Sequence, residues 1–236
     1  MSTTRDAGVE ARPMPLAESV LSELLARIYD GRLPQGALIN EASIAEEFGV
    51  SRGPVREAVR RLQGIQLVTR EPYVKARVVT LTQAGARELF EMRLALEGMA
   101  CRLAAERMSA AEIGELVREL EQDHQRTLTG KLVKSARPRA FDLHERIVSA
   151  SRNSRIIDAL CGDLYHLLRM YRRHSGAIPE RKSQAYAEHW QIVRALKARD
   201  GELAESLMRS HVAHACEHLF DHLPLITGDA AQAQRA

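Results

Sequence analysis

Apolar residues recur at intervals of three and four from residue 82 to residue 222, and this periodicity limits the possible folds more than any other feature. Strand-like alternation is absent from this stretch and glycine is sparse. The pattern predicts an all-α bundle of about six helices. We expect them at residues 82–107, 110–128, 134–151, 154–175, 180–199 and 201–222, so the protein is mainly α.

The segment before this bundle has a different organisation. Leu38, Ile44 and Phe48 are apolar at helical spacing, and Gly49 then ends that helix. Ser51 is a candidate N-cap for a second helix. Residues 67–68 and 74–79 resemble two short strands around a polar turn. Together they predict a winged helix-turn-helix domain over residues 14–78.

The second helix of this motif predicts a cationic face. Arg52, Arg56 and Arg60 are spaced by four, so they form one column along a helix. From residue 50 to residue 77 there are seven basic residues against two acidic ones, although the whole chain has a formal charge of only +3. Such a patch suits the phosphates of DNA. The alternative is an ordinary solvated face.

Composition excludes several classes of protein. The chain has 236 residues, enough for a small domain and a larger one. No run of about 18 apolar residues and no signal-peptide pattern is present, and Cys101, Cys161 and Cys216 lie far apart. We expect a cytoplasmic protein with reduced, buried structural thiols and no membrane partner. Residues 1–13 and 227–236 are expected to be flexible tails.

All nine histidines lie in the predicted bundle, and three of them face inward from three different helices. His144, His189 and His211 each share a helical stripe with apolar residues. One such histidine is usually a satisfied core residue, but three can converge on a divalent metal such as zinc or nickel. His214 is the candidate reserve ligand, while His218 is expected at a solvated or interface edge.

Arg93 is a further inward polar residue, since it shares a helix face with Leu89 and Ala100. A buried guanidinium needs a partner. One interpretation is a structural pair with Glu97, one turn away. The other is a bidentate clamp for the carboxylate of a small effector.

The N-terminal residues resemble the GntR family of bacterial transcriptional regulators, in particular its FadR-like branch. The motif is carried by residues 38–41, 45–50 and the run Ser51-Arg52-Gly53-Pro54-Val55-Arg56-Glu57-Ala58-Val59. The resemblance implies that Ser51, Arg52, Gly53 and Arg56 contact operator DNA, and we expect Arg60 and Lys75 to contact phosphates. Two positions depart from the pattern: Ala42 replaces a frequent basic residue, and the usual wing glycine is missing near Lys75.

The C-terminal half is similar to the FCD domain that accompanies FadR-type DNA-binding domains. Four motifs carry the resemblance: Leu143-His144 with Asn153, Glu188-His189, Arg199-Asp200-Gly201, and Met208-Arg209-Ser210-His211. It implies a metal held by His144, His189 and His211, with a small organic acid as effector at the same histidines, and the clamp interpretation of Arg93 fits such an effector. The usual fourth ligand is an aspartate, but Ala140 stands there. Asp142 lies roughly 200° further around a helix and is a poor substitute.

These features predict a homodimeric regulator, most often a repressor, that binds operator double-stranded DNA and responds to a small carboxylate. The competing hypothesis is a metal-dependent helical-bundle enzyme with an attached nucleic-acid-binding module. A di-iron bundle needs two Glu-x-x-His pairs, and only Glu121–His124 fits, with Asp163–His166 a poor second. A third hypothesis, a non-specific nucleoid-type DNA-binding protein, is disfavoured because it assigns no function to the second domain.

Overall fold

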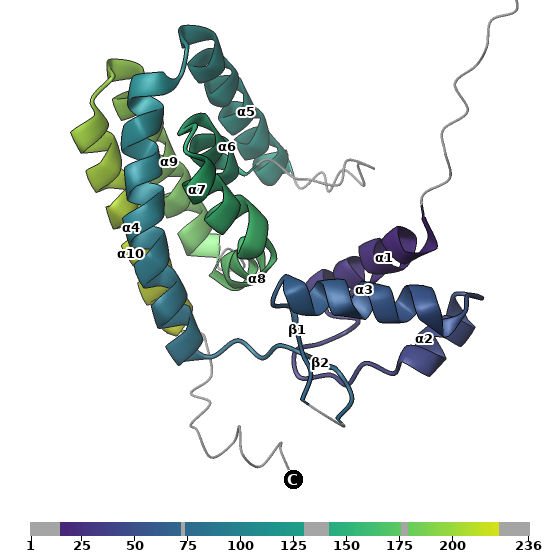
Figure 1. Cartoon of the computed structure of the whole chain (residues 1–236). Helices are drawn as coiled ribbons and strands as arrows, with labels where there is room; N and C mark the ends of the chain where they lie inside the picture. The colour runs from purple at the N-terminus through teal and green to yellow at the C-terminus, as the bar shows by residue number, and fades with distance from the viewer. Residues whose placement is uncertain (1–14, 72–73, 130–141, 176–178, 222–236) are drawn as a thin grey trace, which may run out of the picture. The chain divides into compact units, whose positions relative to one another are not determined.

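A computed structural model describes residues 15–71, 74–129, 142–175 and 179–221. The chain divides after Val79 into two compact units (Figure 1). The expected tails, and the first part of the helix expected at 134–151, lie outside the described residues. No described helix combines the length and apolarity needed to cross a membrane.

Within its described residues, 15–71 and 74–79, the first unit contains three helices and a two-stranded sheet. Their bounds are α1 Leu16–Asp30, α2 Glu41–Glu47, α3 Arg52–Gly64, β1 Val68–Thr69 and β2 Arg77–Val78. Helix α1 was missing from the sequence prediction. It packs on α3 through four buried residues, Val20, Leu21, Leu24 and Ile28.

The predicted helix-turn-helix is confirmed in α2 and α3. Asn40 caps α2, since its Oδ1 accepts hydrogen bonds from the backbone N–H groups of Ala42 and Ser43. Gly49 lies in the turn at φ +62°, a left-handed conformation that favours glycine. Ser51 occupies the N-cap position of α3 with an extended backbone, but its side chain makes no capping hydrogen bond.

The two strands of the predicted wing pair antiparallel, with Val68 opposite Val78. The assignment of Leu38 to the helix before the turn was wrong, because Leu38 forms a bridge with Arg77. Beside it, the Ile39 N–H donates to the Ala76 carbonyl at 2.7 Å. Leu38 is 49% exposed and Ile39 only 2%, which is the alternation of a strand. The segment before α2 therefore anchors the sheet.

The part of the second unit that the structure describes is all helical, as predicted. Its elements are α4 Gln83–Arg107, α5 Ala110–Thr129, α6 Leu143–Ala150, α7 Ser154–Ile157, η1 Asp158–Asp163, α8 Tyr165–Ser175, α9 Pro179–Ala198 and α10 Gly201–Phe220. The single helix predicted at 154–175 is interrupted by η1, a π-helical turn. There the Leu164 N–H bonds to the Ala159 carbonyl five residues back, a local widening of the helix.

Helix α4 packs closely along α10, and the site described below is built around this pair. A Cβ atom at Gly98 would lie 2.9 Å from Cγ of Arg209, so glycine permits the close approach. The three cysteines are free thiols. Cys101 is fully buried, whereas Cys161 and Cys216 are only partly buried. The prediction of buried thiols is therefore confirmed in full for Cys101 alone among the three.

Candidate DNA-binding surface and histidine centre

Helix α3 separates an apolar face from a cationic one. Val55, Val59 and Leu62 have no exposed surface, so they fix the helix on the core of the first unit. The side chains of Arg56 and Arg60 are 67% and 77% exposed on the other face. All six residues predicted to contact DNA are exposed: Ser51, Arg52, Gly53, Arg56, Arg60 and Lys75.

Carboxylates form weak ion pairs with the arginines of this surface. Glu41 lies 3.5 Å from Arg56 Nε and 2.8 Å from a terminal nitrogen of Arg70. Arg60 pairs with Glu57 at 2.9 Å. Glu41 is only 14% exposed, but its arginine partners are 67% and 40% exposed. Pairs with such exposed partners contribute about 0–1 kcal/mol, so phosphates can replace the carboxylates. The sequence prediction counted Arg70 in the cationic segment but missed Glu41 as its partner, because Glu41 lies on a separate helix.

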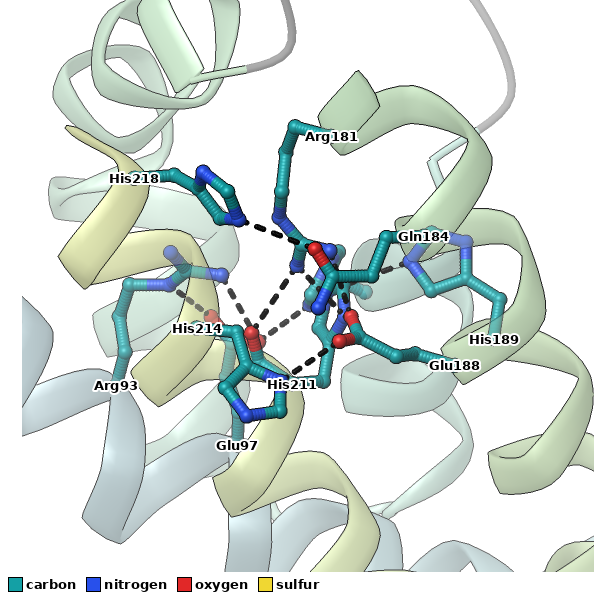
Figure 2. A network of polar contacts seen from close by, with 10 residues as sticks. Arg93, Glu97, Arg181, Gln184, Glu188, His189, His211, His214 and His218 are labelled. Carbon is teal, nitrogen blue, oxygen red and sulfur yellow. Dashed lines mark hydrogen bonds and ion pairs between the residues drawn. The ribbon is translucent and has the colours of Figure 1, made fainter. Parts of the chain in front are cut away.

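In the second unit, the three predicted histidines meet. His144 lies on α6, His189 on α9 and His211 on α10, and their ligand nitrogens all lie within 4.8 Å of one another. Nε2 of His211 is 3.2 Å from Nε2 of His144 and 3.3 Å from Nε2 of His189. Figure 2 shows His189 and His211 converging from their two helices. His144 and His211 are buried and His189 is half-buried.

Two carboxylates face the far sides of two of these rings. Glu97 Oε2 lies 2.5 Å from Nδ1 of His144, and Glu188 Oε2 lies 2.6 Å from Nδ1 of His211. A carboxylate accepts a hydrogen bond there, which favours the tautomer with the hydrogen on Nδ1 and the lone pair on Nε2. Burial lowers the pKa of His211 to about 4, so that ring is neutral at neutral pH.

Each carboxylate is also bonded to a buried arginine. Arg93 Nε donates to Glu97 at 2.6 Å, and both side chains are 1% exposed. This is the structural pair that was the alternative to an effector clamp at Arg93. Arg181 donates to Glu188 at 2.7 Å and to the His211 carbonyl at 3.2 Å (Figure 2). The sequence prediction missed Arg181 and Glu188 as parts of the centre.

Glu188 accepts hydrogen bonds from three side chains. Burial raises its pKa, but hydrogen bonds from His211, His214 and Arg181 outweigh burial and lower the pKa to about 2. His214 Nδ1 lies 2.7 Å from Glu188 Oε1. His214 therefore bonds Glu188 and does not join the three converging histidines as a fourth ligand. His218 bonds Gln184 at 3.0 Å.

The donor set fits a divalent metal. The lone pairs on Nε2 of His144 and His211 face each other across 3.2 Å, an arrangement that a cation between them stabilises. Zinc–nitrogen distances of about 2.0–2.1 Å at a tetrahedral angle place two ligand nitrogens about 3.3 Å apart. Ala140 lies outside the described residues. Asp142 caps α6, accepting from the backbone N–H of His144 at 3.0 Å.

Comparison with known families agrees with both halves of this arrangement. Residues 16–78 match the model described as bacterial regulatory proteins, gntR family, and residues 88–214 match the FCD domain. The FCD match alone spans more than half of the chain. The chain belongs to the GntR family of regulators. The FadR-like resemblance drawn from the motifs is thereby confirmed.

Two relatives align over most of the chain. The HTH-type transcriptional regulator YdhC of Bacillus subtilis is 28% identical over 88% of this chain and 92% of its own length. The "Probable D-xylose utilization operon transcriptional repressor" of Paenarthrobacter nicotinovorans is 34% identical over 84% and 86%. The solved structure of E. coli McbR/YncC shares the fold, with a TM-score of 0.65, 22% identity and coverage of 88% of this chain and 98% of that one.

This GntR-family chain is therefore a transcriptional regulator and not an enzyme. GntR regulators bind operator DNA, and their FCD domains bind small effector molecules. The competing enzyme hypothesis has no support. Its best motif ended at His124, whose ring instead stacks on Tyr186 with centroids 3.6 Å apart.

Proposed function

We propose that this regulator is a repressor whose affinity for its operator changes when a small organic acid binds at the histidine centre. The observation that carries the proposal is the convergence of His144, His189 and His211, which lies within the FCD match. An effector site in that domain is the arrangement by which a GntR protein senses a metabolite. Arg93 already donates a hydrogen bond to Glu97. Its role as a clamp for the acid stays a prediction.

The same three histidines would hold a divalent metal through Nε2, with zinc or nickel as the candidates that imidazole ligands suit. A bound metal supplies a Lewis-acid site that attracts carboxylate oxygens. Glu97 and Glu188 orient two of the rings from behind, at 2.5 and 2.6 Å. Outer carboxylates of this kind raise the basicity of the ligand histidines.

On the DNA side, Arg52 and Arg56 would read base edges in the major groove or position α3 there, and Arg60 and Lys75 would contact phosphates. Their exposure supports these roles. We further propose a homodimer on a near-palindromic operator. Met92 and Met99, two turns apart on α4 and 42% and 39% exposed, offer apolar surface for a second copy.

Fluorescence anisotropy on DNA from the region upstream of the gene tests the DNA-binding role. Wild-type protein should bind with a Kd that rises steeply with salt. Arg56→Ala should weaken binding by about 1–3 kcal/mol. Arg155→Ala, which removes an exposed arginine of the second unit, is the matched control and should bind like wild type. Salt-independent binding, or equal losses in the two variants, would contradict the proposal.

A further inference from the structure

Glu41 lies between two arginines of the cationic surface of the first unit. Its Oε2 is 3.5 Å from Nε of Arg56 on α3. Its Oε1 accepts a hydrogen bond at 2.8 Å from Nη2 of Arg70, which follows strand β1. One carboxylate on α2 therefore connects α3 to the wing.

The backbone on either side of Glu41 is fixed. Asn40 caps α2 by accepting hydrogen bonds from the N–H groups of Ala42 and Ser43. Ile39, two residues before Glu41, is hydrogen-bonded to the sheet at 2.7 Å. A side chain on such a rigid element can orient its partners accurately.

The three side chains differ in exposure. That of Glu41 is only 14% exposed, whereas those of Arg56 and Arg70 are 67% and 40% exposed. A largely covered carboxylate without a cationic partner is costly. Glu41 therefore keeps at least one of its arginines when the other turns to DNA.

The two arginines meet Glu41 through different nitrogens. Arg56 uses Nε, which leaves its two terminal nitrogens for a bidentate contact with O6 and N7 of a guanine. Arg70 uses a terminal nitrogen, Nη2, and a phosphate oxygen competes for the same kind of donor. When Arg70 moves to a phosphate, Glu41 stays paired with Arg56.

We infer that Glu41 positions Arg56 for base recognition, while Arg70 exchanges Glu41 for a DNA phosphate. The inference rests on the proposed DNA contact of Arg56 and adds a residue that controls sequence discrimination. The charge of Glu41 repels the phosphates of every DNA sequence equally. By orienting Arg56, however, Glu41 favours the sequence that offers a guanine at the right place.

The ratio of two DNA affinities tests the positioning role. Selection from a pool of random-sequence duplexes with the wild-type full chain supplies a preferred site, and a scrambled duplex of the same composition is the reference. Fluorescence anisotropy gives Kd for both duplexes, and the scrambled value divided by the preferred one is the discrimination ratio. Both values come from one preparation, so a fraction of unfolded protein cancels.

Glu41→Gln should lower the discrimination ratio by about 5- to 10-fold, because glutamine offers one acceptor oxygen in place of two. The same change should tighten binding to the scrambled duplex by about 2- to 5-fold, since a negative charge is lost. A merely structural role would weaken binding to both duplexes alike.

Glu57→Gln is the matched control. It also removes a carboxylate paired with an arginine of α3, since Glu57 lies 2.9 Å from Arg60. It should tighten binding to both duplexes equally and leave the discrimination ratio unchanged. An unchanged ratio in Glu41→Gln, or an equal fall in both variants, would overturn the positioning role.

A double-mutant cycle distinguishes positioning from direct contact with a base. If Glu41 acts through Arg56, Glu41→Gln should cause no further fall in the discrimination ratio once Arg56 is replaced by alanine. Losses that add in the double variant would show that Glu41 itself contacts a base, and the inference would be wrong.

Arg70 has a different signature. Arg70→Ala should weaken binding to both duplexes alike, and it should reduce the slope of log affinity against log salt by about 1, as expected for one lost phosphate contact. An unchanged slope, or a changed discrimination ratio, would contradict the phosphate role of Arg70.

The outcomes also separate this inference from the proposed function. If the wild-type protein enriches no sequence from the random pool, the proposed operator recognition fails, and the role of Glu41 fails with it. If a sequence is enriched and Arg56→Ala abolishes discrimination while Glu41→Gln does not lower it, only the role of Glu41 is wrong.

Discussion

The buried pair of Arg93 and Glu97 links the stability of the second unit to the order of the histidine centre. Both side chains are 1% exposed, and Glu97 also bonds His144. Charged groups are almost never buried so completely without a partner. The sequence indicated that Arg93 faces inward and that Glu97 could pair with it, because helical spacing fixes neighbours at four residues.

Arg93→Ala should therefore destabilise the protein by about 3–5 kcal/mol, since it leaves the Glu97 carboxylate buried without its cation. Urea unfolding followed by circular dichroism measures the change. Arg102→Ala is the control, because its ion pairs with Glu202 and Glu205 are longer and partly exposed and should contribute about 0–1 kcal/mol. A stable Arg93→Ala variant that has lost only its response to acid would favour the clamp.

Other residues of the centre were beyond prediction from the sequence. Arg181 and Glu188 are seven positions apart on α9 and meet His211 and His214 from α10. Such contacts depend on how two helices pack, and no spacing along one helix encodes them. The sequence showed that His144, His189 and His211 face inward, but it left open whether they meet or lie apart in the core. The structure shows that they meet, with Nε2 of His211 close to Nε2 of the other two.

At the scale of elements, helix α3 combines a rigid apolar face with an exposed cationic one. Its helix-turn-helix was predictable because Gly49, Ser51 and the arginine spacing are local signals. Helix α1 was missed although Val20, Leu24 and Ile28 recur at helical spacing. Leu38 was misassigned because its strand exists only through pairing with residues 76–78, a contact distant in sequence.

Gly53 offers an element-scale test of whether function or folding requires glycine in α3. Its φ is not positive, and a Cβ atom there would meet only Ser51 Oγ, at 3.8 Å. Folding therefore tolerates a side chain, and Gly53→Ala should stabilise the helix by up to about 1 kcal/mol. DNA affinity should fall if the backbone approaches DNA closely. A higher melting temperature with weaker DNA binding supports that role, and unchanged binding removes Gly53 from the interface.

At the scale of the whole molecule, the chain joins a DNA-reading unit to a sensor unit, and the family match covers both. We propose that occupancy of the histidine centre changes DNA affinity. Coupling of this kind typically amounts to about 1–3 kcal/mol. Such coupling requires two states of the protein that differ in affinity for DNA, and a ligand that binds one of these states more tightly than the other.

The most direct test is anisotropy of labelled upstream DNA with metal-stripped protein, before and after addition of Zn²⁺ with each of a panel of dicarboxylates. His189→Ala is the matched variant, because His189 is half-buried and its loss should spare the core. At least one acid should shift the Kd for DNA by about 5- to 150-fold in wild type and leave the variant unchanged. Equal shifts in both proteins, or no shift in wild type with any acid, would show that the histidine centre does not control DNA binding.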